Sequence, residues 1–161
     1  MYANSRIPES AQSGLHEALE SRVNKHAATD FRKPYAPYNV AAFEASLAGW
    51  DQRAPLLLDA GCGVGHSTIA LARAFPDHYV IGVDQSEDRL SRKKPYPDAL
   101  MPTNLVFCRA DLVDYWRLLA DAGIRLDRHY ILYPNPWPKI GHLTRRWHAH
   151  PVFPCVPRLG G

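Results

Sequence analysis

The periodicity of apolar positions changes near residue 55. Before this point, apolar residues recur at helical spacing over residues 15–27 and 40–50, which predicts two amphipathic helices. The two prolines of FRKPYAPY, residues 31–38, are expected to break the first helix. Beyond residue 55, short continuous apolar runs alternate with amphipathic stretches. Such runs are typical of strands that are buried on both faces of a sheet.

Four apolar runs predict four strands, and a helical pattern separates each strand from the next. The strands are expected at PLLLDA (55–60), HYVIGVD (78–84), NLVFCRA (104–110) and RHYILYP (128–134). The helices are expected at 67–75, from a capping Ser86 through Lys94 before KPYP, and at 112–123 with a glycine at the end. This alternation predicts an α/β fold with a mostly parallel sheet. We assign residues 1–52 to a mobile tail (1–14) and two helices, and residues 53–161 to the α/β domain.

Each predicted strand ends in a polar or glycine-rich segment, namely DAGCGVG, GVDQS, CRADL and YPNPW. Because the carboxyl ends of parallel strands meet at one edge of the sheet, we expect these segments to converge on one ligand-binding crevice. The first segment places Gly61, Gly63 and Gly65 after Asp59, so the backbone can turn tightly against a ligand. A dinucleotide fingerprint requires glycine at His66, and the Gly-Lys-Ser/Thr of a P-loop is absent. The loop is therefore not expected to hold a phosphate.

Two acidic residues follow the next two strands. Asp84 can accept hydrogen bonds from both hydroxyls of a ribose, or it can simply start the turn before Ser86. Asp111 either contacts a ligand or caps the helix that follows. A glycine loop and a ribose-binding acid without a phosphate-binding device suit a nucleoside ligand that has no phosphates. S-adenosylmethionine is the ligand we expect.

Composition and charge narrow the class of protein further. The 161 residues are 46% apolar, enough for a core, and no apolar run reaches the length of a membrane helix. The N-terminus lacks a signal-peptide core, so a cytoplasmic protein is expected. The three cysteines fit neither a disulfide framework nor a zinc site. No acid follows Asp127, whereas five basic residues do: Arg128, Lys139, Arg145, Arg146 and Arg158. This asymmetry favours a nucleic-acid partner, the alternative being a solvated face balanced by nearby acids.

These motifs resemble a known family. DAGCGVG, GVD and the exit YPNPWPKIGHLTRR are similar to the corresponding motifs of the bacterial tRNA (guanine-N7)-methyltransferases, the TrmB family, over residues 56–153. Most class I methyltransferases share the glycine motif, whereas Pro-x-Pro-Trp-x-Lys with a trailing Arg-Arg is far more specific. The resemblance implies a Rossmann-like fold, S-adenosylmethionine as the methyl donor, and tRNA as the substrate, methylated at guanine 46.

The resemblance also implies a role for each matching residue. Asp59 and the loop Gly61–Gly65 would hold the methionine part of the cofactor, Asp84 its ribose, and Asp111 would lie near the adenine. Asn135 would take the catalytic position. The expected substrate contacts are Lys139 and, along the tRNA backbone, Arg145 and Arg146.

The first departure from the family is Asn135, because the family has aspartate there. Guanine N7 already carries an in-plane lone pair, so catalysis is mainly positioning and charge stabilisation. An asparagine can orient the base by hydrogen bonds but supplies no charge, at an expected cost of roughly 2–4 kcal/mol in the barrier. Asn-Pro-Trp is also similar to the Asn-Pro-Pro-aromatic motif of amino-methyltransferases. A different methyl acceptor is therefore the nearest alternative.

The second departure is length. The family has a seven-stranded sheet, whereas about four strands are predicted here, and CVPRLGG at the end does not resemble the family. The fourth strand is expected to be left as an uncovered edge, and we expect a truncated or frame-shifted reading frame. An inactive remnant that at most binds RNA is a second alternative, and a nicotinamide-dependent dehydrogenase is a more distant one.

The exit loop itself allows more than one interpretation. Its prolines Pro134, Pro136 and Pro138 fix the backbone, as an active-site loop or any other proline-rich turn requires. Trp137 can stack on a base, line the cofactor crevice or belong to the core. No metal is expected, because the spacing of the nearby histidines and Cys155 matches no standard zinc site. The N-terminal helices can form either a lid over the cofactor or a second RNA-binding surface.

Overall fold

The computed structural model describes residues 14–92, 94, 97, 100–137 and 139–160. The predicted tail and the predicted stop at KPYP therefore lie largely outside the described residues, and Pro138 lies wholly outside them. The chain forms two compact units: Met1–Phe31 with Asn135–Phe153, and Arg32–Pro134 with Pro154–Gly161. We call these the loop unit and the sheet unit. The units divide the chain differently from the predicted boundary at residue 52, because the second helix packs within the sheet unit.

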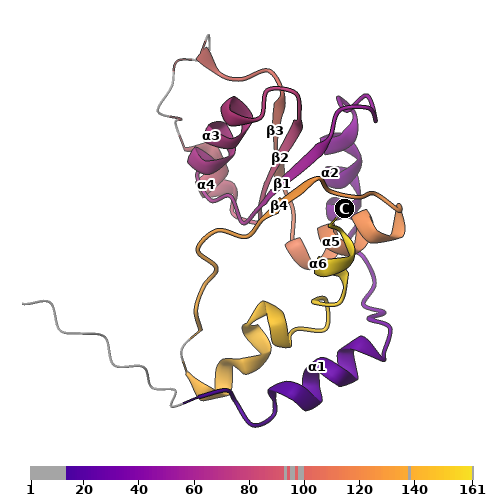
Figure 1. Ribbon diagram of the computed structural model, residues 1–161. Helices are drawn as coiled ribbons and strands as arrows, with labels where there is room; N and C mark the ends of the chain where they lie inside the picture. The colour runs from indigo at the N-terminus through magenta and orange to yellow at the C-terminus, as the bar shows by residue number, and fades with distance from the viewer. Residues whose placement is uncertain (1–13, 93, 95–96, 98–99, 138, 161) are drawn as a thin grey trace, which may run out of the picture. The chain divides into compact units, whose positions relative to one another are not determined.

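The sheet unit contains a four-stranded, all-parallel sheet, which confirms the predicted α/β fold (Figure 1). Its strands are β1 (Leu56–Ala60), β2 (Tyr79–Asp84), β3 (Leu105–Arg109) and β4 (Arg128–Tyr130), in the order β3-β2-β1-β4. Every residue of β1 is buried, as its continuous apolar run predicts. The strand order reverses direction at β1, which has β2 on one side and β4 on the other. Ligands of open α/β sheets bind at such a switch point.

Helices cover both faces of this sheet. In Figure 1, α3 (His66–Ala74) and α4 (Glu87–Ser91) lie on one face, whereas α2 (Pro37–Leu47), α5 (Leu112–Asp121) and α6 (Cys155–Arg158) lie on the other. The amphipathic α5 buries Tyr115 and Trp116 completely. Each uses its polar atom inside the core: the Tyr115 hydroxyl lies 2.8 Å from Ser46 Oγ, and the Trp116 indole donates to His129 Nε2 at 3.0 Å.

Several predicted boundaries shift for local reasons. The prolines at 31–38 do separate the first two helices, but Pro37 is also the first residue of α2, where its missing N–H costs nothing. Ser86 caps α4 as predicted, accepting from Arg89 N, but the helix ends at Ser91 and not at Lys94. The strand predicted over 128–134 ends at Tyr130, so YPNPW follows a short strand through a connecting segment.

Residues 154–160 belong to the sheet unit and pack beside the segment that precedes β4. Leu126, just before β4, donates its N–H to the carbonyl of Leu159 at 2.7 Å and forms an isolated parallel bridge with Gly160. The Arg125 guanidinium also donates to the Gly160 carbonyl, at 3.1 Å. Leu126 and Leu159 are each 1% exposed, so burial of their side chains fixes this segment. Among the described residues, β4 itself pairs with β1 alone, at the edge of the sheet, and the C-terminal segment contacts only the residues just before it.

The loop unit is mostly helical. It holds α1 (Leu19–Ala27) and two 3-10 turns, η2 (Ile140–Arg145) and η3 (Trp147–Ala149), of which η3 contacts α1. The His150 ring lies edge-on to both Phe31 and Trp147, and its Nδ1 accepts from Val152 N at 3.2 Å. Across the described parts of both units, no helix is long and apolar enough to cross a membrane.

Candidate active site

The glycine loop joins β1 to α3 at the carboxyl edge of the sheet. Gly61, Gly63 and Gly65 all have positive φ, at 80°, 59° and 83°. A Cβ on Gly65 would lie 2.4 Å from the Phe107 ring, so this position excludes any side chain. A Cβ on Gly63 would meet no atom within 4 Å. The loop therefore presents bare backbone to open space at Gly63, as a loop that lies against a ligand requires.

Asp59 lies at the base of this loop and is 1% exposed. Its Oδ2 accepts hydrogen bonds from Ser67 Oγ at 2.6 Å and Thr68 Oγ1 at 2.7 Å. Room for Thr68 comes from Gly82 on β2, because a Cβ there would lie 2.6 Å from Thr68 Oγ1. The second carboxylate oxygen, Oδ1, is buried and has no hydrogen-bond partner among the described residues. A buried oxygen of this kind is costly unless a donor reaches it, and a ligand ammonium group is a suitable donor.

Asp84 ends β2 and connects two loops. Its Oδ1 accepts from Ser86 N at 2.8 Å and its Oδ2 accepts from Gly63 N at 2.9 Å. The guanidinium of Arg89 lies 3.8 Å from Oδ2. The predicted turn role of Asp84 is thus present, and the same carboxylate holds the glycine loop. A carboxylate accepts about four hydrogen bonds, so these contacts leave room for ribose hydroxyls.

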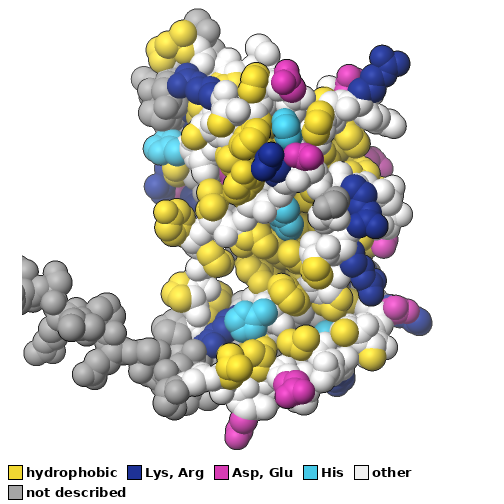
Figure 2. Space-filling view, viewed as in Figure 1, with side chains coloured by type: hydrophobic (Ala, Val, Ile, Leu, Met, Phe, Trp, Pro, Cys, Tyr) yellow, Lys and Arg dark blue, Asp and Glu magenta, His cyan; other side chains and the backbone are white. Residues whose placement is uncertain are grey.

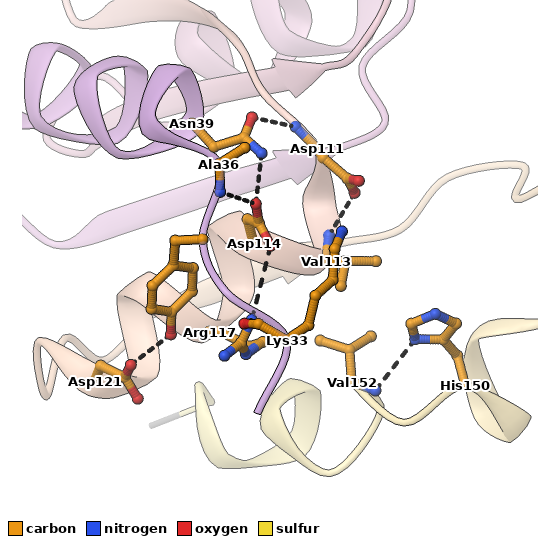
Figure 3. Close-up of polar contacts among 11 residues, drawn as sticks. Lys33, Ala36, Asn39, Asp111, Val113, Asp114, Arg117, Asp121, His150 and Val152 are labelled. Carbon is orange, nitrogen blue, oxygen red and sulfur yellow. Dashed lines mark hydrogen bonds and ion pairs between the residues drawn. The ribbon is translucent and has the colours of Figure 1, made fainter. Parts of the chain in front are cut away.

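Asp111 caps α5 by accepting from Val113 N at 2.8 Å, which confirms the capping role as a local structural feature. Its own N–H donates to Asn39 Oδ1 at 3.0 Å (Figure 3). Asn39 in turn donates from Nδ2 to Asp114 Oδ2 at 2.7 Å. The start of α2 is therefore tied to the residue that follows β3 at the carboxyl edge of the sheet. Sequence reasoning missed Asn39 entirely.

A buried ion pair extends this network. Asp114 and Arg117 both lie on α5, where Asp114 is fully buried and Arg117 is 9% exposed. The Nη1 atom of Arg117 lies 3.7 Å from Oδ1 of Asp114 (Figure 3). Arg117 donates to the Lys33 carbonyl at 2.8 Å and lies 4.2 Å over the Tyr35 ring. Burial, followed by the hydrogen bond to Asp121, raises the pKa of Tyr35 to about 12. The one sequence signal was opposite charges three residues apart within an amphipathic helix.

The strand-exit loop, residues 135–146, lies in the loop unit, where several of its described residues contact Trp137. Asn135 is exposed and accepts through Oδ1 from Trp137 N at 3.3 Å. Arg146 donates from Nε and Nη2 to the Trp137 carbonyl at 3.2 and 3.0 Å. Arg145 lies 4.8 Å over the Trp137 ring, and His142 meets that ring edge-on. The structure thus gives both arginines contacts within the loop, while the side chain of Lys139 is exposed.

The site residues predicted from sequence fall into two groups. Asp59, the three glycines, Asp84 and Asp111 all lie in the sheet unit, and Gly63 is hydrogen-bonded to Asp84. Asn135, Lys139, Arg145 and Arg146 lie in the loop unit. Burial raises the pKa of Cys62, within the glycine loop, to about 12, so its thiol stays protonated at neutral pH. In the described parts of the chain, no three metal-ligating side chains gather into a metal site.

Charged side chains pair locally on the surface. On the face seen in Figure 2, basic and acidic side chains are interspersed. Arg92 lies 2.6 Å from Asp88, and Arg109 lies 2.8 Å from Glu87. These pairs favour the balanced-surface interpretation for the sheet unit. The basic residues of the strand-exit loop are a separate group.

A parallel sheet with this glycine loop and these acids at its carboxyl edge is consistent with a methyltransferase-type α/β protein. A family model described as "Putative methyltransferase" matches residues 53–153. The chain belongs to this methyltransferase family.

Three curated relatives of this chain share one name. The tRNA (guanine-N(7)-)-methyltransferase of Mycobacterium avium is 35% identical over 101 residues, 62% of this chain and 38% of the relative. The enzyme of that name from Mycobacterium ulcerans is 34% identical over 154 residues, 87% of this chain and 55% of the relative. The enzyme of that name from Zymomonas mobilis is 34% identical over 104 residues, which are 65% of this chain and 44% of the relative. These matches confirm the resemblance read from the motifs, and the chain spans about half the length of such relatives or less.

Proposed function

We propose that the protein is an S-adenosylmethionine-dependent methyltransferase that methylates guanine N7 in tRNA. The observation that carries this proposal is the edge of the sheet at β1 and β2. There Gly63 offers bare backbone, Asp59 keeps a buried oxygen without a partner, and Asp84 holds the loop. The names of the relatives support the acceptor and the substrate.

The residues present fit the cofactor. The buried Oδ1 of Asp59 suits the ammonium group of its methionine part, because this oxygen has no donor among the described residues. The open backbone at Gly63 suits the same part of the molecule, Asp84 suits the ribose hydroxyls, and Asp111 suits the adenine. The bound cofactor supplies an electrophilic methyl group on a sulfonium centre.

The protein side of the reaction is positioning. Guanine N7 attacks with its own lone pair, so no residue has to remove a proton before the transfer. Asn135 orients the base through its amide and contributes no charge to offset the cationic ring that forms. Lys139 and the guanidinium of Arg145 contact the tRNA backbone, and Arg146 supports the loop. A tRNA substrate implies action in the cytoplasm.

The test is mass spectrometry of tRNA that has been incubated with the purified chain and S-adenosylmethionine and then digested to nucleosides. We expect 7-methylguanosine to appear and to require the cofactor. A control variant, Glu87→Gln, removes an exposed acid outside the proposed site and is expected to behave like the wild type. A methylated nucleoside of another kind contradicts the proposed acceptor.

An inactive chain that only binds RNA predicts a different pattern. It would bind tRNA in a salt-dependent manner and yield no methylated nucleoside. The same digest, combined with a binding titration at two salt concentrations, separates the two possibilities.

A further inference from the structure

Asn39 uses both ends of its side-chain amide inside the sheet unit. The residue is 1% exposed, and Figure 3 shows its side chain between Asp111 and Asp114. Its Oδ1 accepts a hydrogen bond from Asp111 N at 3.0 Å, and its Nδ2 donates to Asp114 Oδ2 at 2.7 Å. A backbone N–H can only donate and an ionised carboxylate can only accept, so the two ends of this amide cannot be exchanged.

The surroundings of Asn39 hold the amide in place. Asp114 Oδ2 also accepts a hydrogen bond from Ala36 N at 3.1 Å, and Arg117 lies 3.7 Å from Oδ1 of the same carboxylate. The change Asn39→Asp would place an oxygen against Asp114, whereas Asn39→Leu would leave Asp111 N without its acceptor. The buried network therefore requires an amide at this position, and that amide fixes the backbone of Asp111.

Asp111 is half-buried and keeps one carboxylate oxygen for a ligand. Its Oδ1 accepts a hydrogen bond from Val113 N at 2.8 Å, whereas its Oδ2 has no hydrogen-bond partner among the described residues. Because Asn39 holds the N–H of Asp111 and the start of α5 holds Oδ1, the position of Oδ2 is determined before any ligand binds. An acceptor that is placed in advance loses little conformational freedom when a ligand donates to it.

We propose that Asn39 is a positioning residue for the cofactor, because it holds Asp111 where the free carboxylate oxygen accepts a hydrogen bond from the exocyclic amine of adenine. This inference rests on the proposed binding of S-adenosylmethionine and adds a residue that acts on the adenine only through Asp111. The amine of adenine is a hydrogen-bond donor, and a carboxylate oxygen is an acceptor. The site should therefore prefer a base that carries this amine, and the preference should depend on Asn39.

The experiment is calorimetric titration of the purified chain with two ligands. One is S-adenosylhomocysteine, and the other is the same molecule with the amine of its base replaced by hydrogen. Neither ligand carries a methyl group to transfer, so the measurement does not depend on catalysis. We expect the wild type to bind S-adenosylhomocysteine at least about tenfold more tightly, because the ligand without the amine leaves the Asp111 oxygen unpaired. We call the quotient of the two dissociation constants the amine preference.

The variant Asn39→Leu keeps most of the side-chain volume and removes both hydrogen bonds, so the amine preference should fall at least about fivefold. A loss of folded protein weakens both ligands equally and leaves this preference unaltered. The matched control is Ser46→Ala, because Ser46 is also buried on α2 and lies 2.8 Å from the Tyr115 hydroxyl, about two helical turns beyond Asn39. It should lower stability without altering the preference. Asn39→Ser, too short to bridge both partners, gives the same test if Asn39→Leu does not fold.

The variant Asp111→Asn separates the possible outcomes. Its amide oxygen still caps α5, so its NH2 group faces the amine of adenine, and the amine preference should be lost. A preference lost in Asp111→Asn but unaltered in the folded Asn39 variants overturns the role of Asn39 alone. A wild type without the preference, or an Asp111→Asn variant that keeps it, overturns the contact between Asp111 and adenine and hence the whole inference, and leaves the cofactor proposal standing. A folded wild type that binds neither ligand overturns the cofactor proposal as well.

Discussion

Arg117 is the residue whose loss should destabilise the sheet unit most clearly. The change Arg117→Met removes the guanidinium 3.7 Å from Asp114 Oδ1 and keeps most of the side-chain volume. Asp114 is fully buried, and its Oδ1 has no hydrogen-bond partner in the described part of the chain. The variant therefore leaves a buried carboxylate without a counter-charge.

Removing one partner of a buried ion pair lowers the free energy of unfolding by about 3–5 kcal/mol. For a chain of this size, each kcal/mol lowers Tm by about 2–4 °C, so a fall of roughly 6–20 °C is expected. Loss of the hydrogen bond to the Lys33 carbonyl and of the contact with the Tyr35 ring adds to this in the same direction.

The assay is urea unfolding followed by circular dichroism, with Arg92→Met as the matched control. Arg92 pairs with Asp88 at 2.6 Å on the surface, with both side chains more than half exposed, and such pairs contribute at most about 1 kcal/mol. The double variant Arg117→Met with Asp114→Asn should lose less stability than Arg117→Met alone, because no buried charge remains. A loss in Arg117→Met no larger than in the control would refute the buried, charged state of Asp114.

Three further predictions concern stability, each measured by urea or thermal unfolding. Gly65→Ala should lower the free energy of unfolding by about 2–4 kcal/mol, because it combines a φ of 83° with a Cβ that would lie 2.4 Å from the Phe107 ring. The control Gly123→Ala has a positive φ but no atom close to the added Cβ, so it should lower the free energy of unfolding by only about 1 kcal/mol. Equal losses in the two variants would contradict the steric contribution at Gly65. Burial lowers the pKa of His129 to about 4, so the unfolded chain takes up this proton at a higher pH than the folded protein does. The contribution of neutral His129 to the free energy of unfolding should therefore be complete above about pH 6.5 and decrease as the pH falls toward 4. His129→Gln should flatten that fall, and an unchanged pH profile would show that another group causes it. Leu159→Ala should cost about 2–5 kcal/mol if the C-terminal segment is part of the sheet unit, against less than about 1 kcal/mol for the exposed Leu100→Ala.

Most of the fold could be predicted from the sequence because its central strands are encoded locally. The continuous apolar run at Leu56–Ala60 has no helical period, and the structure buries every residue of it. The fourth strand was harder, since the apolar run continues past Tyr130 although the chain leaves the sheet there, and Leu132 is 39% exposed. An apolar pattern indicates which residues tend to be buried, but it does not show where a strand stops pairing with the neighbouring strand.

The features that the sequence did not reveal join residues far apart in the chain. Asp114 accepts hydrogen bonds from Ala36 N and Asn39 Nδ2, which lie more than 70 positions earlier in the chain. A local sequence pattern does not indicate such a network. The packing of Leu159 beside Leu126 is equally non-local, so the end of the chain looked aberrant when read by motif. The turn at Asn135 was missed for another reason: the motif identified the residue type but not the hydrogen bond that its Oδ1 accepts from Trp137 N.

The measurement that tests the central claim most directly is calorimetric titration of S-adenosylmethionine into the purified chain, repeated with Asp84→Ala and with the exposed control Asp88→Ala. The account predicts saturable binding with one site, lost or greatly weakened in Asp84→Ala and unaltered in Asp88→Ala, because Asp84 holds the glycine loop and is the residue that we propose binds the ribose. A folded chain that gives no binding signal, or an Asp84→Ala variant that binds as the wild type does, would contradict the claim that this edge of the sheet is a cofactor site.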